Sequence, residues 1–493
     1  MLKTILNPTN LKFKPEKPLT IVIDYSSPNI AKFFHFGHFR ATVLGNFLTN
    51  LYKTLGHETH SINYIGDWGY QFGLLGYGLQ KDNLSSMNKS LNEIRSLYSN
   101  YNNVSFHNEE FRSEAKIFNA KFESDFWNGN QTDSIREWLN IRNVSLANYM
   151  DLYKKLGIQF DACEFESQYV MESRNSFQKW LDNGYIDNDF SCLNSEKKPV
   201  YLFTPNKASL YLSRDVTAFL SRKKRLKFDR IHYVVDSDQG DHFANVCDFL
   251  RILDPGLEFN ENFHVKFSKV SGQSSRRLSG ISLEKFIDET KANYLLKSLK
   301  SSKAKSSDLD NVARQMTLSW LFFEILKYPR MTQVNTKLHF DNRDLSGRKL
   351  QYTNARISSL FRNVRQMKPG LLSAFDEATA EFDESEIIAK MSDYEKVFSN
   401  LSDHQKMIIN KVVSFVHTYP DVLTQCLNSM DSHLLCNHLN ILVNNLNKLY
   451  ENLSLTNCKS DSELLISILI YLKAKRVIVH GLRLIGVEPL TVI

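Results

Sequence analysis

The stretch that decides the fold is residues 20–65, which opens with TIVID at 20–24 and closes with HSINYI at 60–65. Both segments are typical of short, buried β-strands. Between them come a polar SSPN turn at 26–29 and apolar residues at helical spacing from Val43 to Leu55, just before Gly56. Strand, loop, helix and strand make a βαβ unit, for which we expect a parallel sheet with a right-handed crossover.

Outward from this unit, IHYVV at 231–235 resumes the sheet and is followed by a polar loop and an amphipathic helix. The intervening segment, about 80–205, is rich in Asn, Ser and aromatic residues and reads as a mainly helical insertion. After about residue 300 the strand signals fade and long helical patterns follow one another to the C-terminus. The C-terminal third is therefore expected to be all-α.

Composition sets the limits on protein class. The chain has 493 residues, which is about three times the roughly 150 residues of one typical domain, so we expect two or three domains. With 42% hydrophobic residues, disorder and fibrous classes are excluded. Its longest apolar stretches fall short of the roughly 18 residues that cross a bilayer, so no membrane association is expected. A net charge of +7 permits an anionic partner without demanding one.

The six cysteines never form CxxC, which favours a reducing compartment and no structural zinc. His433, Cys436 and His438 are the one local cluster that looks like ligands, and we interpret them as ordinary helix residues, so no metal site is predicted. The N-terminus carries basic residues and no acidic residue before Glu16, which faintly resembles an organelle presequence.

The loop after the first strand carries the clearest chemistry. It runs from Ser26 to His38 and ends in HFGH, so that His35 and His38 lie one helical turn apart at the start of a helix. There the two imidazoles can donate to phosphate oxygens, and Gly37 removes a side chain that would block an adenine. The alternative is a pair of surface histidines near a turn.

Five ordered motifs extend this loop into a family resemblance: DYSSPNIAK, HFGH, GDWGYQFG at 66–73, LYLSRD at 210–215 and LQYTNARISSL at 350–360. Together they resemble arginyl-tRNA synthetase, a class I aminoacyl-tRNA synthetase, and the wording of the first and last is similar to the mitochondrial branch. The resemblance runs from about residue 20 to the C-terminus. It implies a Rossmann-type catalytic domain split by an insertion, followed by a helical anticodon-binding domain.

A guanidinium needs coplanar anionic acceptors, which carboxylates provide. The resemblance matches the arginine pocket to Asp24, Ser26, Asn29, His35, Tyr211, Asp215 and Gln239. For Asp215 the alternative is a salt bridge to Arg214 or Arg222. The ATP side is matched to His35, Gly37, His38, Gly66, Asp67 and His242, and for Asp67 the alternative is a purely structural turn.

The second class I signature is a Lys-rich loop that clamps the leaving pyrophosphate. The corresponding stretch here is GQSSRRL at 272–278, which is similar to a degenerate form of that loop and contains Arg276 and Arg277 but no lysine. Gln273 replaces an apolar anchor and Leu278 replaces a glycine. In this family a lysine just upstream of HxGH is thought to stand in for the missing one, and Lys32 holds that position. We therefore count His35, His38, Lys32, Arg276 and Arg277 as catalytic candidates.

Two regions are tRNA candidates. SRKKRLKFDR at 221–230 has six basic residues in ten, either a solvated helix face or a contact with acceptor-stem phosphates by Lys223, Lys224 and Arg225. Gln351, Tyr352 and Arg356 match the family's entry to the anticodon-binding helices. The expected fold is thus an α/β Rossmann-type catalytic domain with a mainly helical insertion, then an all-α domain. The limits are a short extension at 1–19, the catalytic domain at 20–300, a helical connection at 301–345 and the anticodon-binding domain at 346–493.

The function implied is ATP-dependent activation of L-arginine to arginyl-adenylate and transfer to tRNA(Arg), with Mg²⁺ accompanying the ATP, by a monomer. A mitochondrial matrix location is favoured and a cytoplasmic one stays open. One rival is a small-molecule nucleotidyltransferase, because those enzymes also use HxGH. A second is a tRNA-binding paralogue without catalysis, suggested by Phe33, Gln273 and Leu278.

Overall fold

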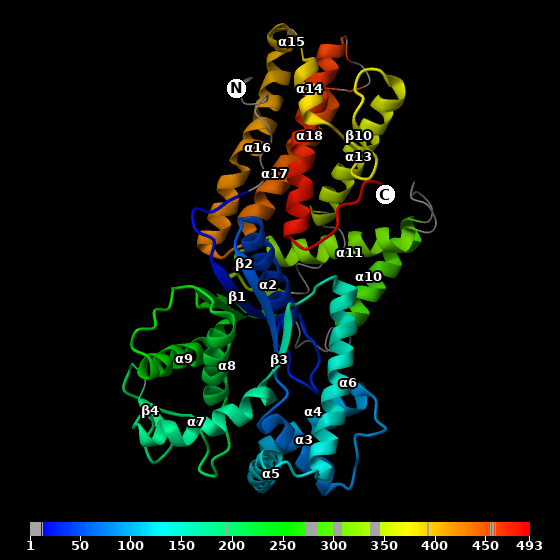
Figure 1. The fold of residues 1–493 in the computed structure, drawn as a ribbon. Helices are drawn as coiled ribbons and strands as arrows, with labels where there is room; N and C mark the ends of the chain where they lie inside the picture. Colours follow the sequence, from blue (N-terminus) through cyan, green and yellow to red (C-terminus); the bar gives the residue numbers. More distant parts are fainter. Residues whose placement is uncertain are drawn as a thin grey trace. The chain divides into compact units, whose positions relative to one another are not determined.

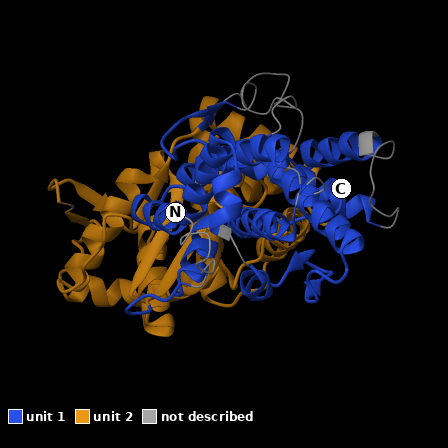
Figure 2. Cartoon of the chain, turned by 90° about the horizontal axis from the view of Figure 1, so that it is seen from above, with its two compact units in different colours: residues 1–18, 46–57, 270–493 blue, residues 19–45, 58–269 orange. Residues whose placement is uncertain are grey.

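The computed structural model divides into two compact units, coloured separately in Figure 2. One unit contains residues 19–45 and 58–269, and the other contains residues 1–18, 46–57 and 270–493. The structure describes Leu11 and residues 13–193, 195–271, 283–298, 308–335, 346–391, 394–453, 455, 458 and 460–493. The second signature loop at 272–278, with Arg276 and Arg277, lies outside the described residues.

A five-stranded parallel sheet organises the first unit, in the order β3-β2-β1-β6-β7. Its strands are β1 (Thr20–Tyr25), β2 (Glu58–Ile65), β3 (Ala162–Phe165), β6 (Arg230–Asp236) and β7 (His264–Phe267). β1 is the central strand, and Ile21, Val22 and Ile23 are fully buried. The predicted βαβ unit is confirmed, since β1 pairs in parallel with β2 across the helix α2 (Phe36–Thr54).

The direction of the strand order reverses at β1, because β2 and β3 lie on one side of it and β6 and β7 on the other. In open parallel sheets such a reversal leaves a crevice beyond the carboxyl ends of the neighbouring strands. The loops that leave β1, β2, β3 and β6 all start from this one edge, and they carry most of the predicted site residues.

The segment from 80 to 205 differs from the expected helical insertion in one respect that matters. It does contain three long helices, α4 (Leu91–His107), α5 (Glu109–Trp127) and α6 (Asp133–Leu156), which follow α3 (Tyr70–Lys81) (Figure 1). However, it also holds β3, which pairs with β2 as a strand of the main sheet. This four-residue strand, ACEF, has no apolar alternation, because its Glu164 is buried against arginine side chains instead.

The first unit also contains helices and short strands outside the five-stranded sheet. Its elements are η1 (Glu166–Tyr169), α7 (Val170–Asp182), the hairpin β4 (Ser191–Leu193) and β5 (Pro199–Tyr201), α8 (Tyr211–Leu226), η2 (Ser237–Gln239) and α9 (Gly240–Leu253). A continuous apolar cluster joins α7, α8 and α9 to the sheet through Phe177, Trp180, Phe219, Phe249 and Phe263. This cluster fixes α8, which supplies Tyr211 and Asp215.

The second unit is mainly helical, as predicted for the C-terminal third. Its helices are α10 (Leu283–Ser298), α11 (Leu309–Leu326), α13 (Ser346–Met367), α14 (Glu384–Lys390), α15 (Tyr394–Asn400), α16 (Asp403–Ser429), α17 (His433–Asn452) and α18 (Asp461–Leu484). Figure 1 shows α16, α17 and α18 packed side by side. Two short pairs of strands depart from the all-α expectation: β8 (Val270–Ser271) with β9 (Val334–Asn335), and β10 (Phe375–Asp376) with β11 (Glu381–Phe382). None of the described helices is both long and apolar enough to cross a bilayer.

Candidate active site

The loop after β1 is held in an unusual backbone conformation. Ser26, Ser27 and Ala31 have positive φ angles of 76°, 44° and 58°. Non-glycine residues adopt such angles at a cost, and they persist only where surrounding contacts fix them. Here α6 supplies those contacts: Ser145 Oγ accepts from the amide of Ala31 at 3.1 Å, and the Tyr149 hydroxyl lies 2.6 Å from the Asn29 carbonyl oxygen.

The HFGH motif forms the start of α2 as predicted, and the two imidazoles lie together. The rings of His35 and His38 stack with their centroids 3.8 Å apart. The backbone amides of Gly37 and His38 donate to Nδ1 of His35, at 3.1 and 3.3 Å. Since Nδ1 is the acceptor, Nε2 of His35 carries the proton and is available as a donor.

Gly37 is required by this ring geometry. A Cβ atom at Gly37 would lie 2.9 Å from two atoms of the His35 ring, which is closer than real contacts allow. Partial burial and the nearby Lys32 cation lower the pKa of His35, and burial together with His35 and Lys32 holds the pKa of His38 well below its usual value. Both imidazoles are therefore neutral at physiological pH and act as hydrogen-bond donors at a helix N-terminus, where anions bind.

Lys32 shares this environment. Its carbonyl oxygen accepts from Nε of Arg95 at 3.1 Å, and its ammonium lies 5.7 Å from the centroid of the Tyr98 ring. Burial lowers the pKa of Lys32, while the charge of Glu166 acts in the opposite direction. The ammonium influences both His35 and His38 electrostatically, which places a positive charge beside the two donors.

Asp24 lies at the end of β1 and is 2% exposed. Its carboxylate accepts from Nη1 of Arg222 at 2.8 Å and from the Ser27 hydroxyl at 3.0 Å. Burial raises the pKa of Asp24 to about 6, against the opposing effect of Arg222. The sequence did not single out Arg222 as a site residue, and its guanidinium already occupies part of the acceptor capacity assigned to the substrate.

Asp215 is half-buried on α8 and its partner is neither Arg214 nor Arg222. The Oδ2 atom of Asp215 lies 2.6 Å from Nε2 of His242 on α9. Arg214 instead pairs with Glu166 at 3.1 Å, and Arg222 pairs with Asp24 and Glu164. The alternative salt bridge is thus wrong, and the structure joins a residue matched to the arginine pocket with one matched to the ATP side.

Glu166 is the most perturbed carboxylate near this pair, and the sequence analysis missed it. It is 7% exposed, and burial raises its pKa to about 8 although Arg214 opposes the shift. Burial, together with the charges of Glu166 and Asp215, raises the pKa of both the Tyr64 and the Tyr211 hydroxyl groups. Perturbed pKa values of this kind are typical of functional sites. Only the short polar strand before Glu166, which lacks any apolar pattern, could have pointed to it.

The remaining predicted residues fall into two groups. Asn29 and Gly66 lie together: their backbones form a parallel bridge, and a Cβ atom at Gly66 would lie 2.0 Å from Oδ1 of Asn29. Ser26 is buried, and its hydroxyl lies 2.7 Å from the Tyr153 hydroxyl. Tyr211 is 48% exposed and Gln239 is exposed at the end of η2. Asp67 is fully buried, and its carboxylate accepts from Nε of Arg142 at 2.8 Å and the Ser167 hydroxyl at 2.7 Å. That geometry favours the alternative of a structural turn.

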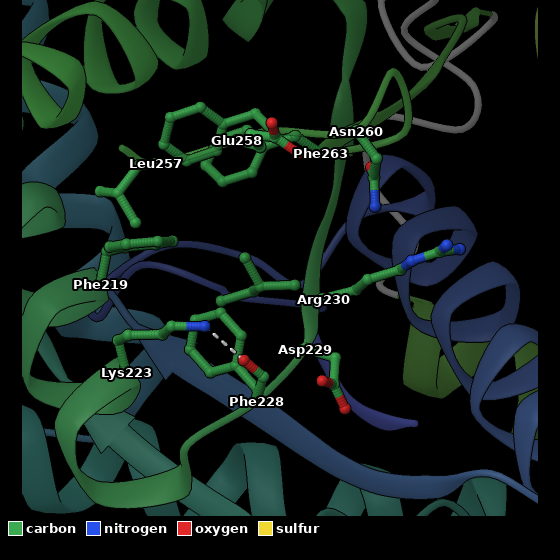
Figure 3. A pocket seen from close by; sticks show the side chains of 11 residues that line it. Phe219, Lys223, Phe228, Asp229, Arg230, Leu257, Glu258, Asn260 and Phe263 are labelled. Carbon is green, nitrogen blue, oxygen red and sulfur yellow. Dashed lines mark hydrogen bonds between the residues drawn. The ribbon is translucent and has the colours of Figure 1, made fainter. Parts of the chain in front are cut away.

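The basic run at 221–230 is divided between the interior and the surface. Arg222 is buried, Arg225 pairs with Glu164, and the Lys223 ammonium donates to the carbonyl oxygen of Phe228 at 2.5 Å, the dashed line in Figure 3. Lys223 and Arg230 are among the residues that line an aromatic cavity beside the first residues of β6, drawn in Figure 3; the cavity has a volume of about 300 Å³. These first residues are the amino end of the strand, opposite to the edge that carries the site. Lys224 is exposed.

The motif residues on α13 do different jobs from one another. Gln351 is fully buried; its amide donates to the Glu488 carbonyl at 2.8 Å and its oxygen accepts from the Leu490 amide at 2.8 Å. Tyr352 is 45% exposed, and the Arg356 guanidinium lies 3.4 Å from the centroid of the Tyr450 ring. Gln351 therefore anchors the C-terminal tail, while Tyr352 and Arg356 remain at the surface.

No group of three His, Cys, Asp or Glu side chains among the described residues is arranged to hold a metal ion. Nε2 of His438, from the cluster noted in the sequence, donates to the Phe415 carbonyl oxygen at 2.8 Å. Mg²⁺ commonly binds with one or two carboxylates plus substrate phosphates and retains several waters, so the absence of such a group says only that there is no ready-made cage here.

Two family models match the chain. Residues 1–336 match the class I tRNA synthetase (R) catalytic domain, and residues 410–493 match the DALR anticodon binding domain. Mitochondrial arginine–tRNA ligase of Saccharomyces cerevisiae is 28% identical over 95% of this chain and 71% of its own length. The probable mitochondrial arginine–tRNA ligase of Homo sapiens is 33% identical over 69% of this chain and 60% of its own length, and a cytoplasmic yeast arginine–tRNA ligase also matches.

The fold comparison agrees. The solved arginyl-tRNA synthetase of Thermus thermophilus superposes with a TM-score of 0.72 at 16% identity, covering 100% of this chain and 85% of that one. At that identity the likeness speaks for the fold alone.

Proposed function

Because this chain belongs to the arginyl-tRNA synthetase family of class I, we propose that it is an arginine–tRNA ligase. It uses ATP to activate L-arginine and transfers the arginyl group to tRNA(Arg). The observation that carries the proposal is the grouping of two neutral imidazole donors, Lys32 and the Asp215–His242 pair at the carboxyl edge of one parallel sheet. The chain spans 60% of the length of the human relative and 71% of the yeast mitochondrial one.

In the first step the arginine carboxylate attacks the α-phosphorus of ATP, an O–P bond forms, and pyrophosphate leaves with the electrons of the broken bond. Nε2–H of His35 and of His38 donates to the phosphate oxygens as charge builds on them. The Lys32 ammonium stabilises the departing pyrophosphate. Protein groups need only position the reactants and stabilise charge, because no covalent intermediate with the enzyme forms.

In the second step a hydroxyl of the terminal adenosine of tRNA attacks the carbonyl carbon of arginyl-adenylate, and AMP leaves. Asp215 supplies the anionic acceptor for the substrate guanidinium, while Ser26 and Asn29 face the other end of arginine. A planar guanidinium can pair with a carboxylate through two parallel hydrogen bonds, which a compact ammonium cannot, so lysine is excluded. Asp24 and Arg222 together determine the charge on the buried side of the arginine pocket.

Several finer points are also part of the proposal. Mg²⁺ enters with ATP as the counter-ion of its phosphates, since the described residues offer no cage of their own. Arg276 and Arg277 help to stabilise the negative charge of the departing pyrophosphate. Lys224, Tyr352 and Arg356 contact tRNA. The enzyme is a monomer of the mitochondrial matrix, with the domain limits given above; matches to mitochondrial relatives support the location.

ATP–pyrophosphate exchange tests the proposal. We expect exchange that depends on L-arginine, measured with and without total tRNA because activation can require it. A nucleotidyltransferase would exchange independently of arginine and tRNA, which would contradict the proposal. Binding of tRNA with no exchange in either condition would identify the non-catalytic paralogue instead.

A further inference from the structure

A second cavity lies in the mainly helical unit, and none of its lining residues belongs to the candidate active site. It has a volume of about 340 Å³ and is bounded by α18, α13, the β10–β11 hairpin and the C-terminal tail. One face of α18 supplies Lys475, Arg476, His480 and Arg483, which recur at helical spacing. We call it the α18 cavity.

Three cations of α18 share two carboxylates beside this cavity. Lys475 is 1% exposed and donates to Glu381 at 2.9 Å and to the Thr379 carbonyl at 2.7 Å. Arg476 contacts Glu381 at 3.3 Å and also pairs with Glu384, and Lys473 pairs with Glu384 at 2.6 Å. The charge of Lys475 also acts on the Asp376 carboxylate, so three positive charges here face three negative ones.

Two further arginines give the surroundings of the cavity a surplus of positive charge. Arg362 donates to the carbonyl oxygen of Thr491 at 3.0 Å, which is an uncharged partner, and its charge acts to lower the pKa of Lys475. Arg483 is exposed at the rim, and its charge adds to the effect of burial in lowering the pKa of His480 to about 4. Within the described part of the chain, no carboxylate is ion-paired with either guanidinium. Like charges in a concave site raise the local concentration of anions.

Asn354 has an acceptor atom that a ligand with a hydrogen-bond donor could pair. It is fully buried and lines the cavity, and its amide NH₂ group donates to the Leu490 carbonyl at 2.8 Å. Its Oδ1 atom is buried with no hydrogen-bond donor among the described residues. Leaving a buried acceptor unpaired costs free energy, which a ligand hydroxyl would recover.

We propose that the α18 cavity binds a phosphate ester that carries hydroxyl groups. The phosphate pairs with Arg483 and the surplus positive charge, and a hydroxyl group donates to Oδ1 of Asn354. A cavity of this volume matches a ligand of sugar-phosphate size. Such a group can come from a free sugar phosphate or from a ribonucleotide of RNA. The site does not depend on the proposed catalytic function.

Isothermal titration of the full chain with ribose 5-phosphate tests the proposal. We expect saturable one-to-one binding, no binding of ribose, and binding of inorganic phosphate at least tenfold weaker. Arg483→Glu should weaken ribose 5-phosphate binding at least tenfold, and Lys448→Glu, at an exposed lysine of α17 in the same unit, should leave it unchanged. Because Arg483 is exposed, the charge reversal should not disturb folding.

Absence of saturable binding, or equal affinity in the wild type and Arg483→Glu, would overturn the site. Equal affinity for ribose 5-phosphate and inorganic phosphate would overturn the role of Asn354. Adding total tRNA at low salt then separates the two sources. Displacement of ribose 5-phosphate by tRNA assigns the cavity to RNA, and retention assigns it to a free sugar phosphate.

Discussion

Among single residues, Asp215 is the first to test, because it is the proposed acceptor for the substrate guanidinium. We expect Asp215→Asn to lower kcat/KM for arginine, with a loss of transition-state stabilisation of about 3–5 kcal/mol. The substitution leaves the partly buried substrate cation without its carboxylate partner. Steady-state charging kinetics measure this. Asp248→Asn is the matched control, since that carboxylate is similarly exposed, 15% against 18%, and pairs with Arg251 elsewhere on the same unit. Kinetics within threefold of wild type for Asp215→Asn would remove this residue from the pocket.

Lys32 is tested by its separate effects on kcat and KM. Its charge acts on pyrophosphate that departs in the transition state, so Lys32→Ala should lower kcat for adenylate formation roughly a hundredfold, the loss typical of one transition-state donor. KM for arginine should change far less, because the ground state does not use this charge. Pre-steady-state formation of arginyl-adenylate measures both. Near-normal activation would return the role to Arg276 or Arg277.

Glu166 gives a prediction about pH. An unfolded glutamate titrates near pH 4.3, whereas burial raises the pKa of Glu166 in the folded chain to about 8. Between these values the folded state binds more protons than the unfolded state, so this group's contribution to stability falls as pH rises. Glu166→Gln lacks that loss, so its urea midpoint relative to wild type should increase from pH 5 to pH 8. A difference that stays constant or shrinks would show that Glu166 titrates normally.

At the scale of elements, α8 is the helix whose sequence is easiest to misread. SRKKR looks like one basic face, yet Arg222 is completely buried between Asp24 and Glu164 while Lys224 is exposed. Burial would raise the pKa of Glu164, but Arg222 and hydrogen bonds from Tyr169 and Arg225 hold it below its usual value. The network thus favours the charged form of Glu164, whereas burial raises the pKa of Asp24 to about 6 despite the same arginine.

Arg222→Met should therefore destabilise the fold by about 3–5 kcal/mol, since it strands two buried carboxylates. Lys224→Met, two positions along the same helix, should change stability by less than about 0.5 kcal/mol. Urea unfolding followed by far-UV circular dichroism compares the two variants. If both lowered the midpoint equally, the division of this run into a buried and an exposed part would be incorrect.

Some of the secondary-structure elements could be predicted from the sequence, and others could not. β1, α2 and β2 were predictable because TIVID, the helical spacing to Leu55 and HSINYI each follow one simple period. The strand β3 was not, because its stability comes from Glu164 bound to arginines distant in the chain rather than from an apolar pattern. For the same reason the partner of Asp215 could not be predicted: the sequence suggested Arg214 or Arg222 as the alternative, and His242 is identified only by the placement of α8 and α9.

In the molecule as a whole, the HFGH and LQYTNAR motifs lie in separate units and have different roles. The HFGH region belongs to the sheet unit, and LQYTNAR belongs to the helical unit, where Gln351 and Asn354 bind the backbone of Glu488 and Leu490. The second motif is thus also a structural one, which fastens the tail and leaves Tyr352 and Arg356 exposed. Sequence alone could not separate these roles, because all four residues are polar or aromatic and lie on one helix.

The central claim is that this chain charges tRNA with arginine. The most direct measurement is aminoacylation of total tRNA with each of the twenty amino acids in turn, using ATP and Mg²⁺. We expect charging with L-arginine alone, and loss of this charging in Asp215→Asn while tRNA binding persists. Charging with a different amino acid, or no charging with arginine by a folded, tRNA-binding chain, would contradict it.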